Sequence, residues 1–120
     1  MKIGINGFGR IGRAVFRINE LQEAFDLVVI NDINVDNNNI AYLTEYDTTY
    51  GRFNHEVTAN DKSIQYNNKK IDIFHKKNIL DVPWDEYDVD VVIDSSGTEE
   101  NLNNIKFTNN TKVKHYIVTN

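Results

Sequence analysis

The first 32 residues constrain the fold more than any other stretch, because a glycine-rich turn lies between two segments typical of buried strands. Residues 1–6 form a short apolar run, and the sequence G-F-G-R-I-G follows directly at 7–12. Residues 13–18 continue with helical spacing, and a second apolar run at 27–30 precedes Asp32. A strand, G-x-G-x-x-G, a helix, a second strand and a terminal acid within about thirty residues form the pattern of a dinucleotide-binding βαβ unit.

Each part of this pattern has a physical reason. Gly7 permits a tight turn out of the first strand, because it has no Cβ atom. Gly9 lets the backbone approach a pyrophosphate, and Gly12 lets the helix pack closely on the sheet. The helix beginning near Arg10 would direct unpaired N–H groups at that phosphate. Asp32 can accept hydrogen bonds from both hydroxyls of an adenosine ribose and would repel a 2′-phosphate, so the sequence predicts NAD in preference to NADP.

Composition excludes several other classes of protein. At 120 residues the chain has the length of one domain. A net charge of −5 gives no electrostatic support for binding nucleic acid or an anionic membrane. The chain has no cysteine, and no apolar run reaches the roughly 18 residues that a membrane span needs. With no signal-peptide pattern either, we expect a soluble, cytoplasmic protein without nucleic-acid or membrane partners.

The middle of the chain changes its period. Residues 40–43 cluster as a short helical turn, whereas residues 46–53 (Y-D-T-T-Y-G-R-F) fit no simple period and favour an ordered loop. Residues 56–59, 63–66 and 70–74 alternate between apolar and polar side chains, and N-D-K and N-N-K separate them. These are hairpin signals, and they predict an antiparallel excursion in an otherwise alternating α/β pattern.

The histidines give no sign of a metal site. His55, His75 and His115 are widely scattered along the chain, and no cysteine accompanies them. His75 lies next to two lysines, which favours a solvated edge over a ligand position. We therefore expect no bound metal.

The last part of the chain returns to parallel strands. Residues 89–94 are predicted to be a buried strand, Thr98 is the expected N-cap of a short helix, and residues 113–118 are the expected last strand. In open α/β sheets, ligands bind at the carboxyl ends of parallel strands. The strand ends expected to converge on one crevice are Gly7, Asp32, residues 95–97 and Thr119. The predicted fold is α/β, a Rossmann-type, doubly wound, mostly parallel sheet with an antiparallel hairpin excursion.

Together these motifs make the chain resemble the N-terminal, NAD-binding part of glyceraldehyde-3-phosphate dehydrogenase. The resemblance rests on K-I-G-I-N-G-F-G-R-I-G-R at 2–13, V-I-N-D at 29–32, A-Y-L-T-E-Y-D-T-T-Y-G-R-F at 41–53, V-P-W at 82–84 and V-D-V-V-I-D-S-S-G at 89–97. Its most specific part is Y-D-x-x-x-G-R-F following N-G-F-G-R-I-G. Erythrose-4-phosphate dehydrogenase shares much of this pattern and is an alternative.

The resemblance implies a set of NAD contacts. Residues 8–11 would meet the pyrophosphate, Asn31 and Asp32 would flank the adenosine ribose, residues 95–97 would border the adenine, and Thr119 would lie near the nicotinamide ribose. The implied cofactor-binding residues are Gly7, Phe8, Gly9, Arg10, Ile11, Asn31, Asp32, Lys77, Ser95, Ser96, Gly97 and Thr119.

Two positions near the implied adenine site depart from the family. Lys77 stands where the family has an arginine that lines the adenine, and it keeps the charge but loses the planar stacking surface. Glu99 replaces the aromatic residue that usually follows this segment. The resemblance therefore implies weaker packing of the adenine in this chain.

The family's catalytic machinery is expected to lie outside these residues. The resemblance places the catalytic cysteine, its partner histidine and the phosphate-binding residues beyond residue 120, and the family's Rossmann domain takes its last helix from the far C-terminus. We therefore expect residues 1–120 to be an incomplete NAD-binding domain, with no catalytic residue and no dehydrogenase activity alone. The parent protein would be a homotetramer with a separate catalytic domain. A natural truncated paralogue that binds NAD without catalysis is an alternative.

Overall fold

The chain folds around a large sheet that is parallel on one side and antiparallel on the other. A computed structural model describes residues 1–47, 49–105 and 111–119. The strands of the large sheet are β1 (Lys2–Asn6), β2 (Asp26–Asn31), β5 (Thr58–Ala59), β6 (Ser63–Tyr66), β7 (Lys69–Phe74), β8 (Val91–Asp94) and β9 (His115–Val118). The remaining elements are α1 (Arg10–Gln22), α2 (Asn37–Glu45), β3 (Tyr46–Asp47), β4 (Gly51–Arg52), the 3-10 helices η1 (Ile79–Asp81) and η2 (Trp84–Tyr87), and α3 (Glu99–Ile105).

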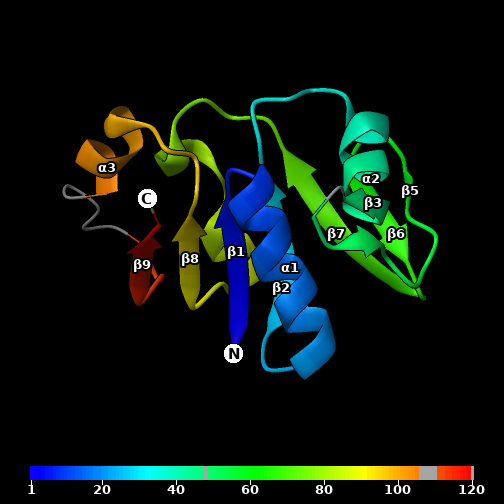
Figure 1. Ribbon diagram of the computed structural model, residues 1–120. Helices are drawn as coiled ribbons and strands as arrows, with labels where there is room; N and C mark the ends of the chain where they lie inside the picture. Colours follow the sequence, from blue (N-terminus) through cyan, green and yellow to red (C-terminus); the bar gives the residue numbers. More distant parts are fainter. Residues whose placement is uncertain (48, 106–110, 120) are drawn as a thin grey trace.

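The order of the strands confirms the predicted α/β class. The large sheet runs β5-β6-β7-β2-β1-β8-β9, and its members from β7 to β9 are parallel (Figure 1). Strand β1 has a parallel neighbour on each side, since β2 and then β7 add at one edge of β1 and β8 pairs with the other edge. The order of the parallel strands therefore reverses beside β1, which is the switch point where such sheets bind ligands.

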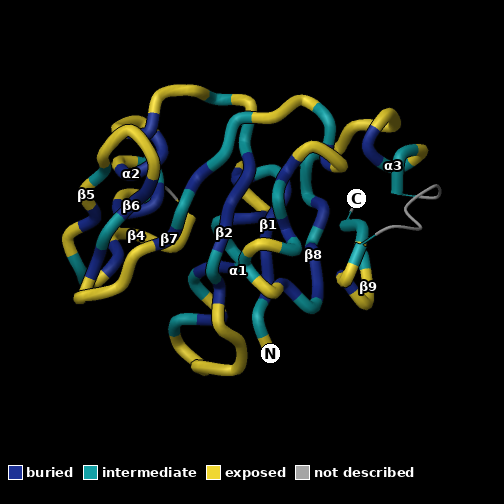
Figure 2. The backbone as a smooth tube through the Cα atoms, turned by 180° about the vertical axis from the view of Figure 1, so that it is seen from behind, coloured by how far each residue is buried: buried dark blue, intermediate teal, exposed yellow. Residues whose placement is uncertain are grey.

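The sheet has an apolar cluster on each face. Ile3 and Ile5 of β1 pack with Phe16 of α1, whereas a Cβ atom on the intervening Gly4 would lie 2.5 Å from the ring of Trp84. Successive residues of a strand point to opposite faces, so β1 contacts α1 on one side and Trp84 of η2 on the other. Figure 2 shows the buried central strands with exposed loops around them.

The predicted hairpin excursion is confirmed. Strand β6 pairs with β7 in antiparallel register, and β5 adds to the outer edge of β6. Asn67 and Asn68 between β6 and β7 have φ angles of 47° and 62°. A two-residue loop with positive φ at both positions matches the twist of the strands it joins, and asparagine tolerates that conformation. The N-N-K signal in the sequence therefore has a direct structural basis.

The segment predicted as an ordered loop over 46–53 contains a short ladder that was not predicted. Tyr46 pairs with Arg52, and Asp47 pairs with Gly51, so that β3 and β4 form a small antiparallel ladder. Thr48 lies outside the described residues. Each strand has only two residues. Such short strands produce no alternation that a periodicity argument can detect.

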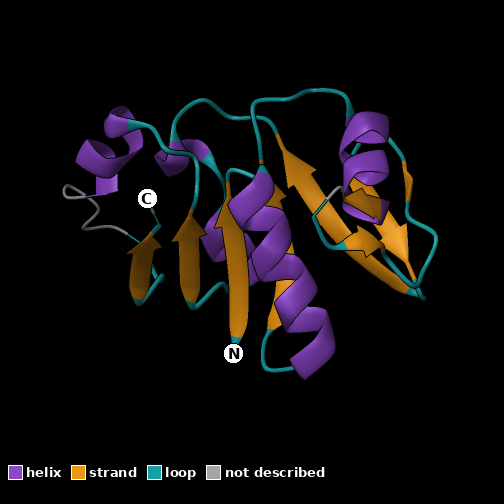
Figure 3. Cartoon of the chain, viewed as in Figure 1, coloured by secondary structure: helices purple, strands orange, loops and turns teal. Residues whose placement is uncertain are grey.

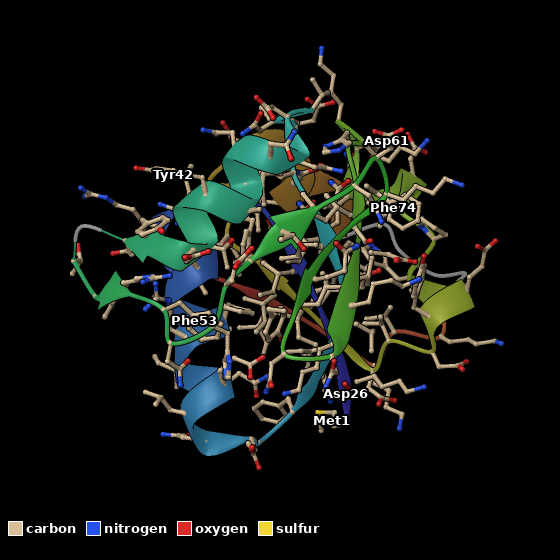
Figure 4. All side chains as sticks on the ribbon, turned by 90° about the vertical axis from the view of Figure 1, so that its right-hand side faces the viewer. Met1, Asp26, Tyr42, Phe53, Asp61 and Phe74 are labelled. Atoms are coloured by element: carbon tan, nitrogen blue, oxygen red, sulfur yellow. The ribbon has the colours of Figure 1, made fainter. Side chains whose placement is uncertain are left out.

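Side chains from outside the ladder hold it against α1. One guanidinium nitrogen of Arg17 donates to the carbonyl oxygens of Thr44, Glu45 and Gly51 at 3.0, 3.1 and 2.9 Å. The same guanidinium lies 5.1 Å from the ring centroid of Phe53, which Figure 4 shows next to α1. The ladder therefore depends on contacts made across the chain.

Two carboxylates of this region predict an acid-sensitive hairpin. Backbone N–H groups of Tyr50 and Thr49 lower the pKa of Asp47, and the N–H of Val57 lowers the pKa of Glu45. A carboxyl whose pKa is lowered in the folded state stabilises that state above its ordinary pKa and loses this contribution as the pH falls toward the folded value. We expect the Tyr50 and Val57 amides to lose protection, measured against their intrinsic exchange rates, below about pH 4. Amide exchange followed by NMR measures this, and Glu45→Gln with Asp47→Asn should flatten the pH dependence.

Helix boundaries differ slightly from the predicted ones. Helix α2 begins at Asn37 and not at residue 40, because Asp36 caps it by accepting from the N–H of Asn39 at 3.1 Å. Helix α3 begins after Thr98, whose hydroxyl oxygen lies 3.4 Å from the N–H of Asn101, as the predicted N-cap requires. In the described part of the chain, no helix combines the length and apolar character needed to cross a bilayer.

Candidate functional site

The carboxyl ends of the parallel strands form one row across the sheet. Asn6 of β1 lies opposite Asn31 of β2 and Asp94 of β8, Asn31 lies opposite Phe74, and Asp94 lies opposite Val118. The residues that come next in each chain segment are His75, Asp32, Gly7, Ser95 and Thr119. The strand ends therefore converge at one edge of the sheet, as predicted, and Figure 3 shows the loops that follow them.

The three glycines of the turn differ in what surrounds them. Gly7 has a φ angle of +90°, and a Cβ atom there would lie 2.6 Å from the backbone of Ser96. A Cβ atom on Gly12 would lie 2.4 Å from the carbonyl oxygen of Gly7. No heavy atom lies within 4 Å of a Cβ built on Gly9. Packing thus requires the first and third glycines, whereas the second borders open space into which a ligand can approach.

The N-terminus of α1 faces this open space. Gly9 is its N-cap residue, and no side chain caps the helix there. The first amides of a helix lack acceptors within the helix, so those of Arg10 and Ile11 are available to an anion. The side chain of Phe8 is 3% exposed and packs edge-on against Phe16. Its contribution to a ligand site is therefore limited to its backbone.

Asp32 is held in place and still has capacity to bind. One carboxylate oxygen accepts from the N–H of Phe8 at 2.7 Å, and the other accepts from the N–H of Asn34 at 2.8 Å. A carboxylate offers about four acceptor positions, so two remain for further donors. The two hydroxyl groups of a ribose can donate to these two positions.

Behind the turn lies a buried polar network that the sequence analysis missed. The Asn6 amide donates to Asp94 Oδ1 at 3.0 Å, and the Asn31 amide donates to Asn6 Oδ1 at 2.7 Å. Asp94 Oδ1 also accepts from the N–H and hydroxyl of Ser96 at 3.2 and 2.7 Å. Asn6, Asn31 and Asp94 are each 2% exposed. The polar residue that ends each of the apolar strands β1, β2 and β8 is the signal that could have revealed this network.

Several predicted contact residues make structural contacts in this network or at its edge. The hydroxyl of Ser95 donates to the carbonyl oxygen of Gly7 at 2.5 Å, and the hydroxyl of Thr119 lies 3.4 Å from the carbonyl oxygen of Asp94. Gly97 is exposed with a φ angle of +70°, and Lys77 is exposed beyond the end of β7. All the predicted site residues therefore lie at the same edge of the sheet, but the Asn31 side chain is directed into the protein interior.

His75 does not lie on a solvated edge, so that expectation is wrong. The residue is partly buried, and its Nδ1 lies 2.8 Å from the carbonyl oxygen of Asp32. The backbone explains this proximity, because the N–H of Asp32 bonds to the carbonyl oxygen of Phe74 at 2.9 Å. Among the described residues, no group of His, Asp and Glu side chains is arranged to hold a metal ion.

This geometry defines a class of protein. A parallel sheet with its switch point beside β1, a glycine turn with open space at its second glycine, and an acid at the end of β2 together form a Rossmann-type dinucleotide-binding domain. In such domains, a helix N-terminus can bind a phosphate group and a carboxylate can accept hydrogen bonds from ribose hydroxyls.

Comparison with known proteins identifies the family. The sequence profile described as "Glyceraldehyde 3-phosphate dehydrogenase, NAD binding domain" matches residues 1–102. The chain therefore belongs to the glyceraldehyde-3-phosphate dehydrogenase family, of which it represents the NAD-binding domain, and its cofactor is NAD.

Individual relatives agree with this assignment. A Bacillus cereus protein named glyceraldehyde-3-phosphate dehydrogenase 1 is 46% identical over 96 residues, which cover 80% of this chain and 28% of that protein. The protein of the same name from Candida glabrata is 41% identical over 97 residues, covering 81% of this chain and 29% of its own. The protein of the same name from Kluyveromyces lactis is 36% identical over 119 residues, which cover 99% of this chain and 36% of that protein. The chain thus spans about a third of the length of these relatives.

Proposed function

We propose that this chain is the cofactor-binding part of a phosphorylating glyceraldehyde-3-phosphate dehydrogenase, which oxidises glyceraldehyde 3-phosphate with NAD and phosphate in glycolysis. The observation that carries the proposal is the alignment of the glycine turn with Asp32 and the end of β8 in one row. The names of the relatives support the reaction. The proposed location is the cytoplasm.

In this proposal, the described residues bind and orient NAD, whose nicotinamide accepts the hydride. Asp32 accepts hydrogen bonds from the adenosine ribose, and the first amides of α1 bind the pyrophosphate. Residues 95–97 and Lys77 border the adenine, and Thr119 reaches the nicotinamide ribose. Asn31 supports the site from the protein interior and does not contact NAD through its side chain, because that side chain is buried and bonded to Asn6.

The chemical step is assigned to other parts of the whole protein. A thiolate nucleophile is needed to form a covalent intermediate with the aldehyde, and this chain has no cysteine. We propose that a catalytic domain supplies the nucleophile, that the whole protein is a homotetramer, and that residues 1–120 alone bind NAD without dehydrogenase activity.

Asp32 offers the direct test of the site. We expect Asp32→Ala to weaken NAD binding by about tenfold or more, because two charge-assisted hydrogen bonds to the ribose are lost. Isothermal titration calorimetry measures the affinity, and the same concentration of NAD should raise the melting temperature of the unmodified chain more than that of the variant. Asp61→Ala is the matched control, since Asp61 is exposed in a turn between β5 and β6. Unchanged NAD affinity in Asp32→Ala would contradict the proposed site.

A further inference from the structure

The Asp32 backbone is held by a histidine that the proposed function does not use. His75 Nδ1 lies 2.8 Å from the carbonyl oxygen of Asp32. A carbonyl oxygen can only accept a hydrogen bond, so Nδ1 is the donor in this contact. Together with the bonds from Phe8 and Asn34 to the carboxylate, this contact restrains both the backbone and the side chain of Asp32.

The imidazole ring is itself fixed in this orientation. Among the described residues, its buried Nε2 has no hydrogen-bond partner. Among these residues, the hydrogen bond that orients the ring is therefore the one that Nδ1 makes with Asp32.

The segment that carries His75 is anchored independently. The Asn31 side chain bonds to Lys76 at two points, accepting from its N–H at 2.8 Å and donating to its carbonyl oxygen at 2.9 Å. This two-point contact extends the pairing of β2 and β7 beyond their last residues. Asn31 thus anchors the backbone on the carboxyl side of His75, whose ring contacts the Asp32 carbonyl oxygen through Nδ1.

We infer that His75 is a positioning residue for NAD, which holds Asp32 where its carboxylate can meet the adenosine ribose. The inference rests on the proposed role of Asp32. Its consequence is selectivity, because a carboxylate in a fixed place both bonds to a free 2′-hydroxyl and repels a 2′-phosphate. Loosening Asp32 should therefore weaken NAD binding while weakening NADP binding less.

The test compares three substitutions at one position in the 120-residue chain. His75→Leu removes the donor, His75→Asn places an amide N–H close to the position of Nδ1, and His75→Gln places one at the position of Nε2. We expect His75→Leu and His75→Gln to weaken NAD binding about fivefold and to lower the ratio of NAD to NADP affinity, whereas His75→Asn retains both. Calorimetric titration with each dinucleotide gives these values.

A second measurement needs no ligand. The N–H of Phe8 bonds to the Asp32 carboxylate, so its solvent exchange reports whether Asp32 is held. We expect the Phe8 amide to exchange faster in His75→Leu and His75→Gln but not in His75→Asn, while the buried Ile5 amide in β1 remains protected in all three. If His75→Leu does not fold, the difference in Phe8 exchange between His75→Gln and His75→Asn tests the positioning role.

The outcomes separate this inference from the proposed function. An unchanged affinity ratio and unchanged Phe8 exchange in both His75→Leu and His75→Gln would overturn the positioning role. Unchanged NAD binding in Asp32→Ala, or no NAD binding by the unmodified chain, would overturn the proposed site, and the Phe8 exchange would then decide alone whether His75 holds Asp32.

Discussion

Replacing Gly12 by alanine is expected to lower the free energy of unfolding by about 2 to 3 kcal/mol. The added Cβ atom would lie 2.4 Å from the carbonyl oxygen of Gly7, 3.1 Å from Ser95 Oγ and 3.2 Å from Ile5 Cγ2. The Gly7 carbonyl cannot move away easily, because Gly7 itself packs on the backbone of Ser96. Alanine gains about 1 kcal/mol in helix propensity over glycine, so the clash must exceed that gain. Urea unfolding followed by circular dichroism measures the difference.

Gly9→Ala is the matched control for this prediction. The substitution is chemically identical, but a Cβ atom on Gly9 meets no heavy atom within 4 Å, and its φ angle is −83°. We expect its effect on the free energy of unfolding to stay within about 0.5 kcal/mol. NAD binding should nevertheless weaken by about tenfold, because the methyl group occupies the space through which the pyrophosphate approaches. A large loss of stability in Gly9→Ala, or none in Gly12→Ala, would contradict the two roles.

Asn6→Ala is expected to destabilise the fold by about 3 kcal/mol. The substitution removes a donor from the Asp94 carboxylate and an acceptor from the Asn31 amide, and both groups are buried beyond the reach of water. Asp94 keeps its bonds from Ser96 and the Asn31 amide keeps its bond to the carbonyl oxygen of Lys76, so each buried group loses one of its hydrogen bonds and not all of them. The measurement is again urea unfolding. Asn38→Ala in α2 removes the same atoms from an exposed position and should change stability by less than about 0.5 kcal/mol.

A double-mutant cycle tests whether these groups act as a unit. If Asn6 and Asp94 stabilise each other, removing both should cost less than the sum of the single losses, by about 1 kcal/mol or more. Additive losses from Asn6→Ala and Asp94→Ala would show that the bond between them contributes little.

The βαβ unit could be predicted from sequence because its signals are local. The G-x-G-x-x-G turn, the helix after it and the apolar run before Asp32 each have a recognisable pattern within a few residues. The same holds for the Asn67-Asn68 turn, whose conformation depends on the two residues themselves. The convergence of the strand ends could be predicted too, because parallel strands place their carboxyl ends at the same edge.

The supporting contacts could not be predicted because they join distant residues. The bond between Asn6 and Asp94 spans 88 positions, and the contact of His75 with Asp32 spans 43. In sequence, His75 stands beside lysines, and nothing local distinguishes it from an exposed residue. The β3–β4 ladder was missed for a similar reason, since Arg17 holds its segment from α1.

The pairing of β1 also has a consequence for the order in which the chain folds. The β6–β7 hairpin closes over two residues, and isolated hairpins form within about ten microseconds. Strand β1, by contrast, needs β8, whose last residue lies 88 positions further on. Closing so long a loop is slow, because the chain loses conformational entropy before the stabilising contacts form. During synthesis on the ribosome, β1 therefore lacks its neighbour β8 until residue 94 has emerged. In that interval one edge of β1 is unpaired, and binding by chaperones is most important then.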